Sequence, residues 1–564
     1  MQYNFKKSLF PLLLLSLLIS YSCNNDSNFY NGMVSSAHPI ASKIGLDILQ
    51  KGGNAFDAAV AVHFALSVVY PNAGNIGGGG FLVYRLNDGK IGTLDFREKA
   101  PENSFRDMYI DNIEGKLKVD DKRSKMGHLA SGVPGSVDGM VKIYEKFSTL
   151  EWNELLDPSI KVARDGFEVT EKQAKGLNNV RESLLSANDH EIPFTKEIEW
   201  KLGNVLIQEN LAQTLEEIKK SKRDGFYKGK VAELIIDEME SGGGIITQTD
   251  LDNYSSEWRD PVIGYFKNHK IISMGPPSSG GIALVQLLNG AEQLETQNYY
   301  HNSLEYINTI AEIESRVYAD RASYLGDPDF FNVPQKYLLD QNYLLRRFSE
   351  IKNNIKTPSS EVKEGSFEGN ESDETTHFSI VDKYGNAVSV TTTINGGYGS
   401  KVVVEGAGFL LNNEMDDFSV KPGYPNMFGL VGGEANSIEP NKRMLSSMTP
   451  TIIEKNDKLF MVVGTPGGST IITSVFQTIL NVIDYGMGMQ EAVDSKKFHH
   501  QWLPDVLAVE ENTLSDKLSN DLTQIGHKIV KRSSLGRMDC ILVKEDGSLE
   551  GGADKRGDNI ALGY

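Results

Sequence analysis

The sequence is poor in cysteine: Cys23 and Cys540 are the only two among 564 residues. If Cys23 is lipidated, as its position below suggests, Cys540 has no partner and the protein is held together without disulfides. Nor does any group of histidines, cysteines or carboxylates have metal-ligand spacing. The sequence therefore predicts no metal and no cofactor.

Positive charge is also in short supply, with 57 Lys and Arg against 76 Asp and Glu, a formal net charge of −19. An acidic surface disfavours nucleic acid and anionic membrane surfaces as partners. The composition, 40% hydrophobic and 24% charged, is typical of a globular protein with one large or several small domains.

Only the N-terminus has a long apolar run, "SLFPLLLLSLLIS" after Lys6 and Lys7. It is too short and too early for a stable membrane span, and its basic flank is typical of an export signal. Because the run ends at "YSC", residues 1–22 are predicted to be a lipoprotein-type signal peptide, with Cys23 as the lipidated mature N-terminus. The bulky Tyr21 leaves plain cleavage and secretion open. Either way we expect an exported bacterial protein, periplasmic or anchored at the outer membrane.

The chain changes character once, at residues 352–374, "KNNIKTPSSEVKEGSFEGNESDE". Before this stretch the pattern alternates strands and helices. Residues 33–69 predict a strand and two helices, the first ending at Gly52 and the second capped by Asn54. After it the apolar period becomes two, as in strands. The stretch itself has few apolar anchors, so we expect a flexible tether where cutting is tolerated. A plain surface linker is the alternative.

The segment after the tether predicts a β-hairpin. In "TTHFSIVDKYGNAVSVTTT" the loop Lys383-Tyr384-Gly385 supplies the glycine that a left-handed turn position needs. Counting outward pairs Val381 with Ala387 and continues to the ends of both strands. The other expected pairs are Ile380–Val388, Ser379–Ser389, Phe378–Val390, His377–Thr391 and Thr375–Thr393. This register puts apolar side chains on one face and hydroxyls on the other.

A hydroxyl pair at the start of the hairpin has a chemical consequence. Thr393 would lie opposite Thr375, with Asn395 just beyond. A threonine needs a base to act as a nucleophile, and cutting before Thr375 would supply its own α-amine. The alternative is that threonine is simply common in strands.

The hairpin and the sequence around it resemble the γ-glutamyltranspeptidases, also called glutathione hydrolases, of the N-terminal-nucleophile hydrolase superfamily. The likeness runs from about residue 33 to the end. It is carried in order by "GGNAFDAAVA", "NAGNIGGGGF", "LDFREKAPE", "SGVPGSVDG", "GPPSSGG", "YADRASYLGDPDF", "TTHFSIVDKYGNAVSVTTTINGGYGS", "GAGFLLNNEMDDFSVKPG", "RMLSSMTPTI", "GTPGGS" and "GADKRGDNIALGY".

The resemblance implies an α+β fold, a four-layer αββα sandwich, and a precursor that cuts itself into two chains that stay associated. The large chain would be residues 23–374 and the small chain residues 375–564. Thr375 would attack the γ-glutamyl amide of glutathione or a related donor. The acyl-enzyme would then pass its γ-glutamyl group to water, an amino acid or a peptide.

Further site residues are implied by the same resemblance, and each also has an ordinary structural interpretation. Arg97 and the serines Ser446 and Ser447 would bind the donor α-carboxylate, although an arginine between acids is often a surface ion pair. Asp417, with Glu414 and Asn395, would bind the α-ammonium, although "EMDD" is also typical of a solvated turn. The remaining assignments are Thr393 beside the nucleophile, Gly467 and Gly468 as the oxyanion hole, and Phe428 as the gate of a lid at residues 421–436.

Two other features invite functions that we reject. "GNIGGGG" follows no clear first strand and lacks a Lys-Ser/Thr ending, so it predicts neither a dinucleotide site nor a P-loop. His377 lies near the nucleophile, but an N-terminal amine makes a histidine base unnecessary, so we expect it to be structural.

Two alternatives to a glutathione-type enzyme remain open. Close relatives of the family act on poly-γ-glutamate or acylated β-lactams, and Arg97 with the serine pair argues against β-lactams. A binding lipoprotein that has kept the fold and lost catalysis would reveal itself by failing to cut its own chain.

Overall fold

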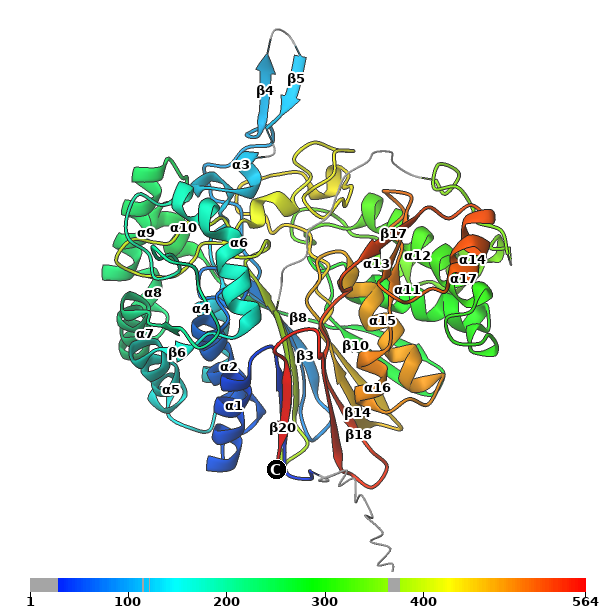
Figure 1. The fold of residues 1–564 in the computed structure, drawn as a ribbon, viewed down its shortest axis with the longest axis horizontal. Coiled ribbons are helices and arrows are strands. Elements are labelled where there is room, and N and C mark those ends of the chain that lie inside the picture. Colours follow the sequence, from blue (N-terminus) through cyan, green and yellow to red (C-terminus); the bar gives the residue numbers. More distant parts are fainter. Residues whose placement is uncertain (1–28, 114–115, 121, 353, 364–375) are drawn as a thin grey trace, which may run out of the picture.

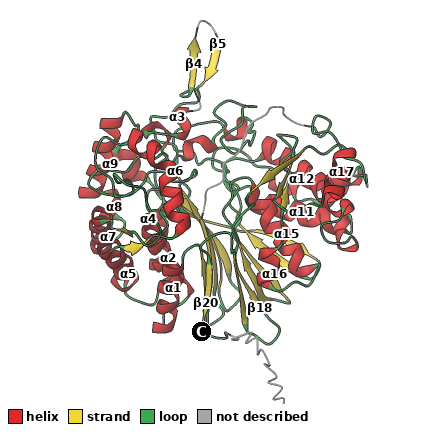
Figure 2. Ribbon diagram, in the orientation of Figure 1, coloured by secondary structure: helices red, strands yellow, loops and turns green. Residues whose placement is uncertain are grey.

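Two β-sheets lie face to face at the centre of the protein, and helices cover the outer side of each (Figures 1 and 2). This computed structural model describes residues 29–113, 116–120, 122–352, 354–363 and 376–564. The order of layers is helix, sheet, sheet, helix, which confirms the expected αββα sandwich. The signal segment, Cys23, residues 364–374 and Thr375 lie outside the described residues.

The first sheet has seven strands and mixes segments from both sides of the predicted tether. β11 pairs antiparallel with β1, and β12 pairs with β2, so the hairpin lies between two strands from the first part of the chain. A cut before the hairpin would therefore leave these backbone hydrogen bonds intact. In sheet order the strands are β20 (Ile560–Gly563), β1 (Met33–Ser36), β11 (Thr376–Val381), β12 (Ala387–Thr393), β2 (Gly79–Arg85), β3 (Ile91–Asp95) and β8 (Glu257–Arg259).

The second sheet has six strands and also draws on both parts. Its order is β19 (Leu549–Ala553), β18 (Asp539–Val543), β14 (Lys458–Val463), β13 (Thr451–Lys455), β10 (His269–Ser273) and β9 (Val262–Phe266). The remaining strands form small sheets: β4 (Ile110–Ile113), β5 (Lys116–Val119), β6 (Phe167–Glu168), β7 (Val205–Leu206), β15 (Phe498–His499), β16 (Leu507–Glu510) and β17 (Ile529–Arg532).

The first two helices outside the first sheet have the expected boundary between them. Gly52 ends α1 with a left-handed φ of 109°, and the Asn54 side chain accepts hydrogen bonds from the first backbone N–H groups of α2. The stripe predicted on α2 is incomplete, because all 15 of its residues are buried. The helices on this side are α1 (Pro39–Lys51), α2 (Ala55–Val69), α4 (Ser136–Phe147), α5 (Trp152–Asp165), α6 (Glu171–Ala187), α7 (Glu209–Ser221), α8 (Asp224–Tyr227), α9 (Gly229–Gly242) and α10 (Gln248–Asn253), with α3 (Lys122–Lys125) near β4 and β5.

The helices outside the second sheet include three from the last part of the chain, which is therefore less purely β than its start indicated. The buried helix α15 begins at Thr470, directly after the predicted oxyanion glycines. The helices on this side are α11 (Gly280–Gln293), α12 (Leu304–Tyr324), α13 (Gln335–Leu338), α14 (Gln341–Ser349), α15 (Thr470–Ile483), α16 (Met489–Asp494) and α17 (Asp516–Gln524).

The described beginning of the predicted tether is held to the body. The indole N–H of Trp502 donates to the carbonyls of Ser359 and Val362, both at 3.0 Å. The side chain of Val362 is buried. The prediction of a flexible tether is therefore wrong for residues 354–363, while residues 353 and 364–374 lie outside the described residues.

Candidate active site

Most of the residues predicted to form the site converge on one pocket, lined by the end of β12 and by loops next to other strands of the two sheets. The pocket is small, with a volume of about 20 Å³, little more than one water molecule needs. Its lining contains nine of the predicted residues and four others: Arg97, Thr393, Asn395, Glu414, Asp417, Phe428, Ser446, Ser447 and Gly468, with Arg321, Leu430, Met448 and Ile471. Gly467 is the neighbour of Gly468 in the chain. Thr375 lies outside the described residues.

The predicted register of the hairpin is confirmed wherever the structure describes both partners. Val381 pairs with Ala387, and the pairing continues through His377–Thr391 to Thr376–Thr392. Gly385 has the expected positive φ of 89°. The pair Thr375–Thr393 remains a prediction. At Thr393, the side-chain oxygen accepts a hydrogen bond from the Asn395 N–H at 2.7 Å.

The polar face of the hairpin is buried between the two sheets. Ser379 donates to the Asp539 carbonyl of β18 at 2.8 Å, while Phe378 and Ile380 belong to the core on the helical side. Both ring nitrogens of His377 have hydroxyl partners, Thr391 at 2.9 Å and Ser379 at 3.1 Å. Burial lowers the pKa of His377 to about 3, so the imidazole is neutral at physiological pH. These contacts support the structural role expected for His377.

The glycine run before β2 lets two backbones approach closely. A Cβ on Gly78 would lie 2.1 Å from the carbonyl oxygen of Thr393, and one on Gly80 would lie 2.4 Å from that of Thr391. Side chains there would push β12 out of the sheet. The run thus serves strand packing beside Thr393.

Arg97 is the centre of a buried charge network. Its guanidinium lies 2.7 Å from Glu414 Oε2, 2.5 Å from Asp417 Oδ2 and 3.6 Å from Glu98 Oε2. Only 1% of the Arg97 side chain is exposed, so the alternative of a surface ion pair is wrong. The alternative of a solvated acidic turn at "EMDD" is wrong too, because Glu414 is fully buried and Asp417 is nearly so.

Three buried acids of this network face a single arginine, and their pKa values are raised. Burial raises the pKa of Glu98 to about 8, against the opposing effect of Arg97. Burial likewise raises the pKa values of Glu414 and Asp417. Burial disfavours the charge of Arg97, but Glu414, Glu98 and Asp417 outweigh it and raise the pKa of Arg97. A zwitterionic ligand carries one charge of each sign. The guanidinium can bind its negative group and the acids can bind its positive group.

Ser446 and Ser447 approach the pocket from the loop before β13. The Ser446 Oγ accepts from the Met448 N–H at 3.1 Å, and the Ser447 Oγ accepts from Arg321 Nη2 at 3.0 Å. Each hydroxyl oxygen thus accepts one hydrogen bond within the protein, and its O–H can donate to a ligand. Two O–H donors beside Arg97 fit a carboxylate.

Gly467 and Gly468 form a turn that only glycine adopts without strain, with φ values of 139° and 50°. Among the described residues, no backbone carbonyl accepts from either N–H. The turn leads into α15, whose N-terminus adds partial positive charge. Two adjacent N–H donors at such a place can hold a developing oxyanion.

The predicted lid, residues 421–436, contributes Phe428 and Leu430 to the lining of the pocket and is held by two acids of "EMDD". The Met427 N–H donates to Asp416 at 2.7 Å, and the Asn426 side chain donates to Asp417 at 3.1 Å. Phe428 is buried and lies against Gly468, where an added Cβ would come within 2.5 Å of the ring. Phe428 of the predicted lid therefore lies at the side of the pocket next to the predicted oxyanion hole.

Arg321 is the charged residue of the pocket that sequence analysis missed. It lies on α12 and is buried. Its signal was present in the motif "YADRASYLGDPDF", but an arginine inside an amphipathic helix is ordinarily taken for a surface residue.

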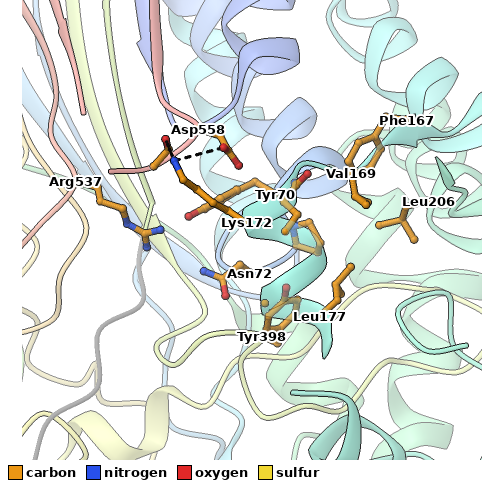
Figure 3. A pocket seen from close by; sticks show the side chains of 14 residues that line it. Tyr70, Asn72, Phe167, Val169, Lys172, Leu177, Leu206, Tyr398, Arg537 and Asp558 are labelled. Atoms are coloured by element: carbon orange, nitrogen blue, oxygen red, sulfur yellow. Dashed lines mark hydrogen bonds and ion pairs between the residues drawn. The ribbon is translucent and has the colours of Figure 1, made fainter. Parts of the chain in front are cut away.

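A larger pocket, with a volume of about 130 Å³, lies beneath the start of α6 (Figure 3). It contains none of the predicted site residues. Lys172 pairs there with Asp558 at 3.7 Å.

Within the described ranges no group of three or more histidines, cysteines or acids could hold a metal ion, and no described helix is both long and apolar enough for a membrane span.

Comparison with known proteins identifies what this chain resembles. Residues 41–564 match the family model described as gamma-glutamyltranspeptidase. The glutathione hydrolase proenzyme of Escherichia coli is 46% identical over 536 residues, covering 94% of this chain and 92% of the relative. The crystal structure of cephalosporin acylase from Bacillus halodurans matches with a TM-score of 0.82 at 25% identity, covering 100% and 99% of the two chains. The γ-glutamyltranspeptidase of Helicobacter pylori matches at 44% identity with a TM-score of 0.57, covering 58% of this chain and 94% of that one.

Proposed function

Because this chain belongs to the γ-glutamyltranspeptidase family and is a self-processing γ-glutamyl hydrolase/transpeptidase, we propose that Thr375 is its nucleophile and that the Arg97 pocket binds the donor. The large chain would be residues 23–374 and the small chain residues 375–564. The observation that carries the proposal is the convergence of Arg97, Asp417 and Ser446 with Gly468 on one pocket beside Thr393.

The donor's amino-acid end carries one charge of each sign, and the pocket offers a partner for each. Its α-carboxylate would take the guanidinium of Arg97 and the O–H groups of Ser446 and Ser447. Its α-ammonium would take Asp417, with Glu414 and Asn395 beside it. Arg97 and Asp417 already contact each other at 2.5 Å, so the donor would insert its two charges into an existing ion pair.

Catalysis would then follow the chemistry of an N-terminal threonine. The α-amine of Thr375 removes the hydroxyl proton as the oxygen attacks the γ-carbonyl carbon. The N–H groups of Gly467 and Gly468 hold the oxyanion, and the leaving amine takes the proton. Water, an amino acid or a peptide then attacks the ester and releases the γ-glutamyl group. Closure of the lid at Phe428 would limit the access of water.

Processing would use the same hydroxyl. The Thr375 oxygen attacks the Glu374 carbonyl carbon, and the peptide bond becomes an ester with a free α-amine. Hydrolysis of the ester then separates the two chains. The shared sheet, in which β11 and β12 lie between β1 and β2, would keep them together as a heterodimer.

Two other functions are less well supported. Cephalosporin acylase is the name of a structural relative, but Arg97 together with the O–H groups of Ser446 and Ser447 favours a ligand with a free α-carboxylate. A silent binding protein would not need hydroxyl and N–H donors converging beside Thr393. We also propose export and a lipid anchor at Cys23, on the sequence alone.

The test is a pair of variants at the nucleophile. We expect Thr375→Ala to remain one uncut, inactive chain, whereas Thr375→Ser should still be cut, because serine also offers a hydroxyl and, once cut, an amine. Chain composition is measured by intact mass, and activity by release of a γ-glutamyl anilide. A fully cut Thr375→Ala protein would exclude Thr375 as the processing nucleophile.

A further inference from the structure

Arg321 is a buried cation for which neither the fold nor the chemistry above gives a reason. It extends from α12 into the wall of the Arg97 pocket, and only 4% of it is exposed. Among the described residues, no aspartate or glutamate lies within ion-pair distance of its guanidinium. Burial lowers the pKa of Arg321, with Tyr318 and Asp417 opposing the change. A buried charge without a direct counter-ion is costly, so it needs an explanation.

The guanidinium of Arg321 contacts one serine of the predicted carboxylate site directly and is linked to the backbone of the other through Ser279. Its Nη2 donates to Ser447 Oγ at 3.0 Å. Its Nε donates to Ser279 Oγ at 3.0 Å, and Ser279 donates in turn to the Ser446 carbonyl, from its hydroxyl at 2.6 Å and its N–H at 2.8 Å. The planar guanidinium of Arg321 thus fixes Ser447 directly and Ser446 through Ser279.

This arrangement favours the hydroxyl of Ser447 as a hydrogen-bond donor. Its oxygen accepts from the Arg321 cation, which polarises the O–H and makes it a stronger donor. An anion in the pocket would accept a hydrogen bond from this O–H and would also be attracted by the positive charge of Arg321. A neutral carboxamide would gain much less from the charge.

We propose that Arg321 is a positioning residue that makes the pocket selective for donors with a free α-carboxylate, acting through Ser447 and through Ser279 on Ser446. This rests on the proposed function in that it takes the Arg97 pocket as the donor site. It adds a second cation to the carboxylate side of that pocket. Arg97 contacts the donor directly, whereas Arg321 orients the serines.

The test compares ligands that differ only at the α-carboxylate. Binding of L-glutamate and of its α-carboxamide is measured by calorimetry on the purified protein, alongside KM and kcat for a γ-glutamyl anilide. In Arg321→Met we expect glutamate affinity to fall roughly ten- to a hundred-fold, the value of one charge-assisted hydrogen bond. Affinity for the α-carboxamide should change by less than about three-fold on the same scale. The KM for the anilide should rise by a factor similar to the loss of glutamate affinity, and kcat should change little.

Further variants separate orientation from charge and from simple damage. Arg321→Lys keeps the charge but cannot make both bonds of the fork, so it should recover only part of the selectivity. Arg316→Lys alters another buried arginine of α12, one that pairs with Glu312, and should leave selectivity intact. Self-cleavage of the precursor involves no donor carboxylate and should proceed in all three.

Equal loss of affinity for both ligands in Arg321→Met and Arg321→Lys would mean that Arg321 only holds the loop, and would overturn the proposal. Unchanged selectivity would overturn it as well. Failure of the proposed function looks different: the wild-type protein would then lack a cut at Thr375 or would not turn over the anilide, whereas the ligand comparison reads the pocket by binding alone.

Discussion

The Arg97 guanidinium donates to Asp417 at 2.5 Å across 320 residues of sequence, inside a pocket that both residues line. Each is the natural partner of one end of an amino acid: the cation for its carboxylate and the acid for its ammonium. With no ligand between them, they neutralise each other. The pair therefore lowers the cost of burying two charges in the empty site while keeping both ready for a zwitterion.

Asp417→Asn should weaken donor binding more than it slows the chemical step. The amide keeps the shape but loses the charge that would face the α-ammonium, so we expect KM to rise roughly ten- to a hundred-fold. The measurement is steady-state release of a γ-glutamyl anilide. Asp329→Asn is the matched control, because the half-exposed Asp329 pairs with Arg259 at 2.6 Å and does not line the pocket. An unchanged KM in Asp417→Asn would contradict the assignment.

Thr393→Val should slow self-cleavage. The variant keeps the side-chain shape and removes the hydroxyl that would face Thr375 and that accepts from Asn395. We expect processing to slow by about ten-fold or more, with a stability loss of about 1–2 kcal/mol from the lost hydrogen bond. Both are measured on the precursor, by a time course of chain cutting and by denaturant unfolding.

Thr391→Val is the control for this prediction. It lies on the same face of β12 and loses a hydroxyl partner of His377, so it should lose similar stability but cut at the normal rate. Equal slowing in both variants would show that the effect comes from the strand and not from the hydroxyl next to the nucleophile.

Gly468→Ala should remove most of the activity. A left-handed alanine costs about 1–2 kcal/mol, and its Cβ would come within 2.5 Å of the Phe428 ring, so both the N–H donor and the lid must shift. We expect kcat to fall roughly a hundred-fold, as when an oxyanion donor is lost. Gly486→Ala has the same backbone cost, with φ of 65° and nothing within 4 Å of the added Cβ. It should lose similar stability and keep full activity.

His63→Leu should reduce the sensitivity of the fold to acid. Burial lowers the pKa of His63 to about 4, against a smaller effect of a hydrogen bond at Asn75. Below its unfolded pKa of about 6.5, the unfolded chain binds a proton that the folded chain does not, so the wild type loses stability as pH falls from about 6.5 towards 4. The difference in unfolding free energy between variant and wild type should therefore grow by about 1.4 kcal/mol between pH 7.5 and 5.5.

This prediction is checked by denaturant unfolding at several pH values. Between pH 7.5 and 9 the imidazole is neutral in both states, so the difference between variant and wild type should stay constant there. If the difference in unfolding free energy stayed constant down to pH 5.5, His63 would be taking up its proton as readily in the folded as in the unfolded chain, which would contradict the prediction.

The hairpin could be predicted in detail because all its information is local. Alternating residues, together with the left-handed Gly385, are enough to set the pairing of β11 and β12. The helix α2 shows the limit of such patterns. Its stripe Val60, Phe64 and Val68 was visible, but burial on all sides depends on α1, α4, α5 and the sheet packing round it, and no periodicity within α2 reports that.

The site itself could not be derived from local pattern. Arg97 and Asp417 are joined only by the fold, and the sequence pattern around each is equally typical of surface charges. Family resemblance named both residues, but it did not indicate that they would form an ion pair. Arg321 and Ser447 lie 126 residues apart, so the contact that gives Arg321 its interest exists only in three dimensions.

The central claim is that the chain is cut before Thr375 to create its nucleophile, and intact-mass and N-terminal analysis of the purified mature protein tests it most directly. We predict two associated chains, the smaller beginning at Thr375. A single uncut chain that still released the γ-glutamyl group, or a small chain beginning at another residue, would contradict it.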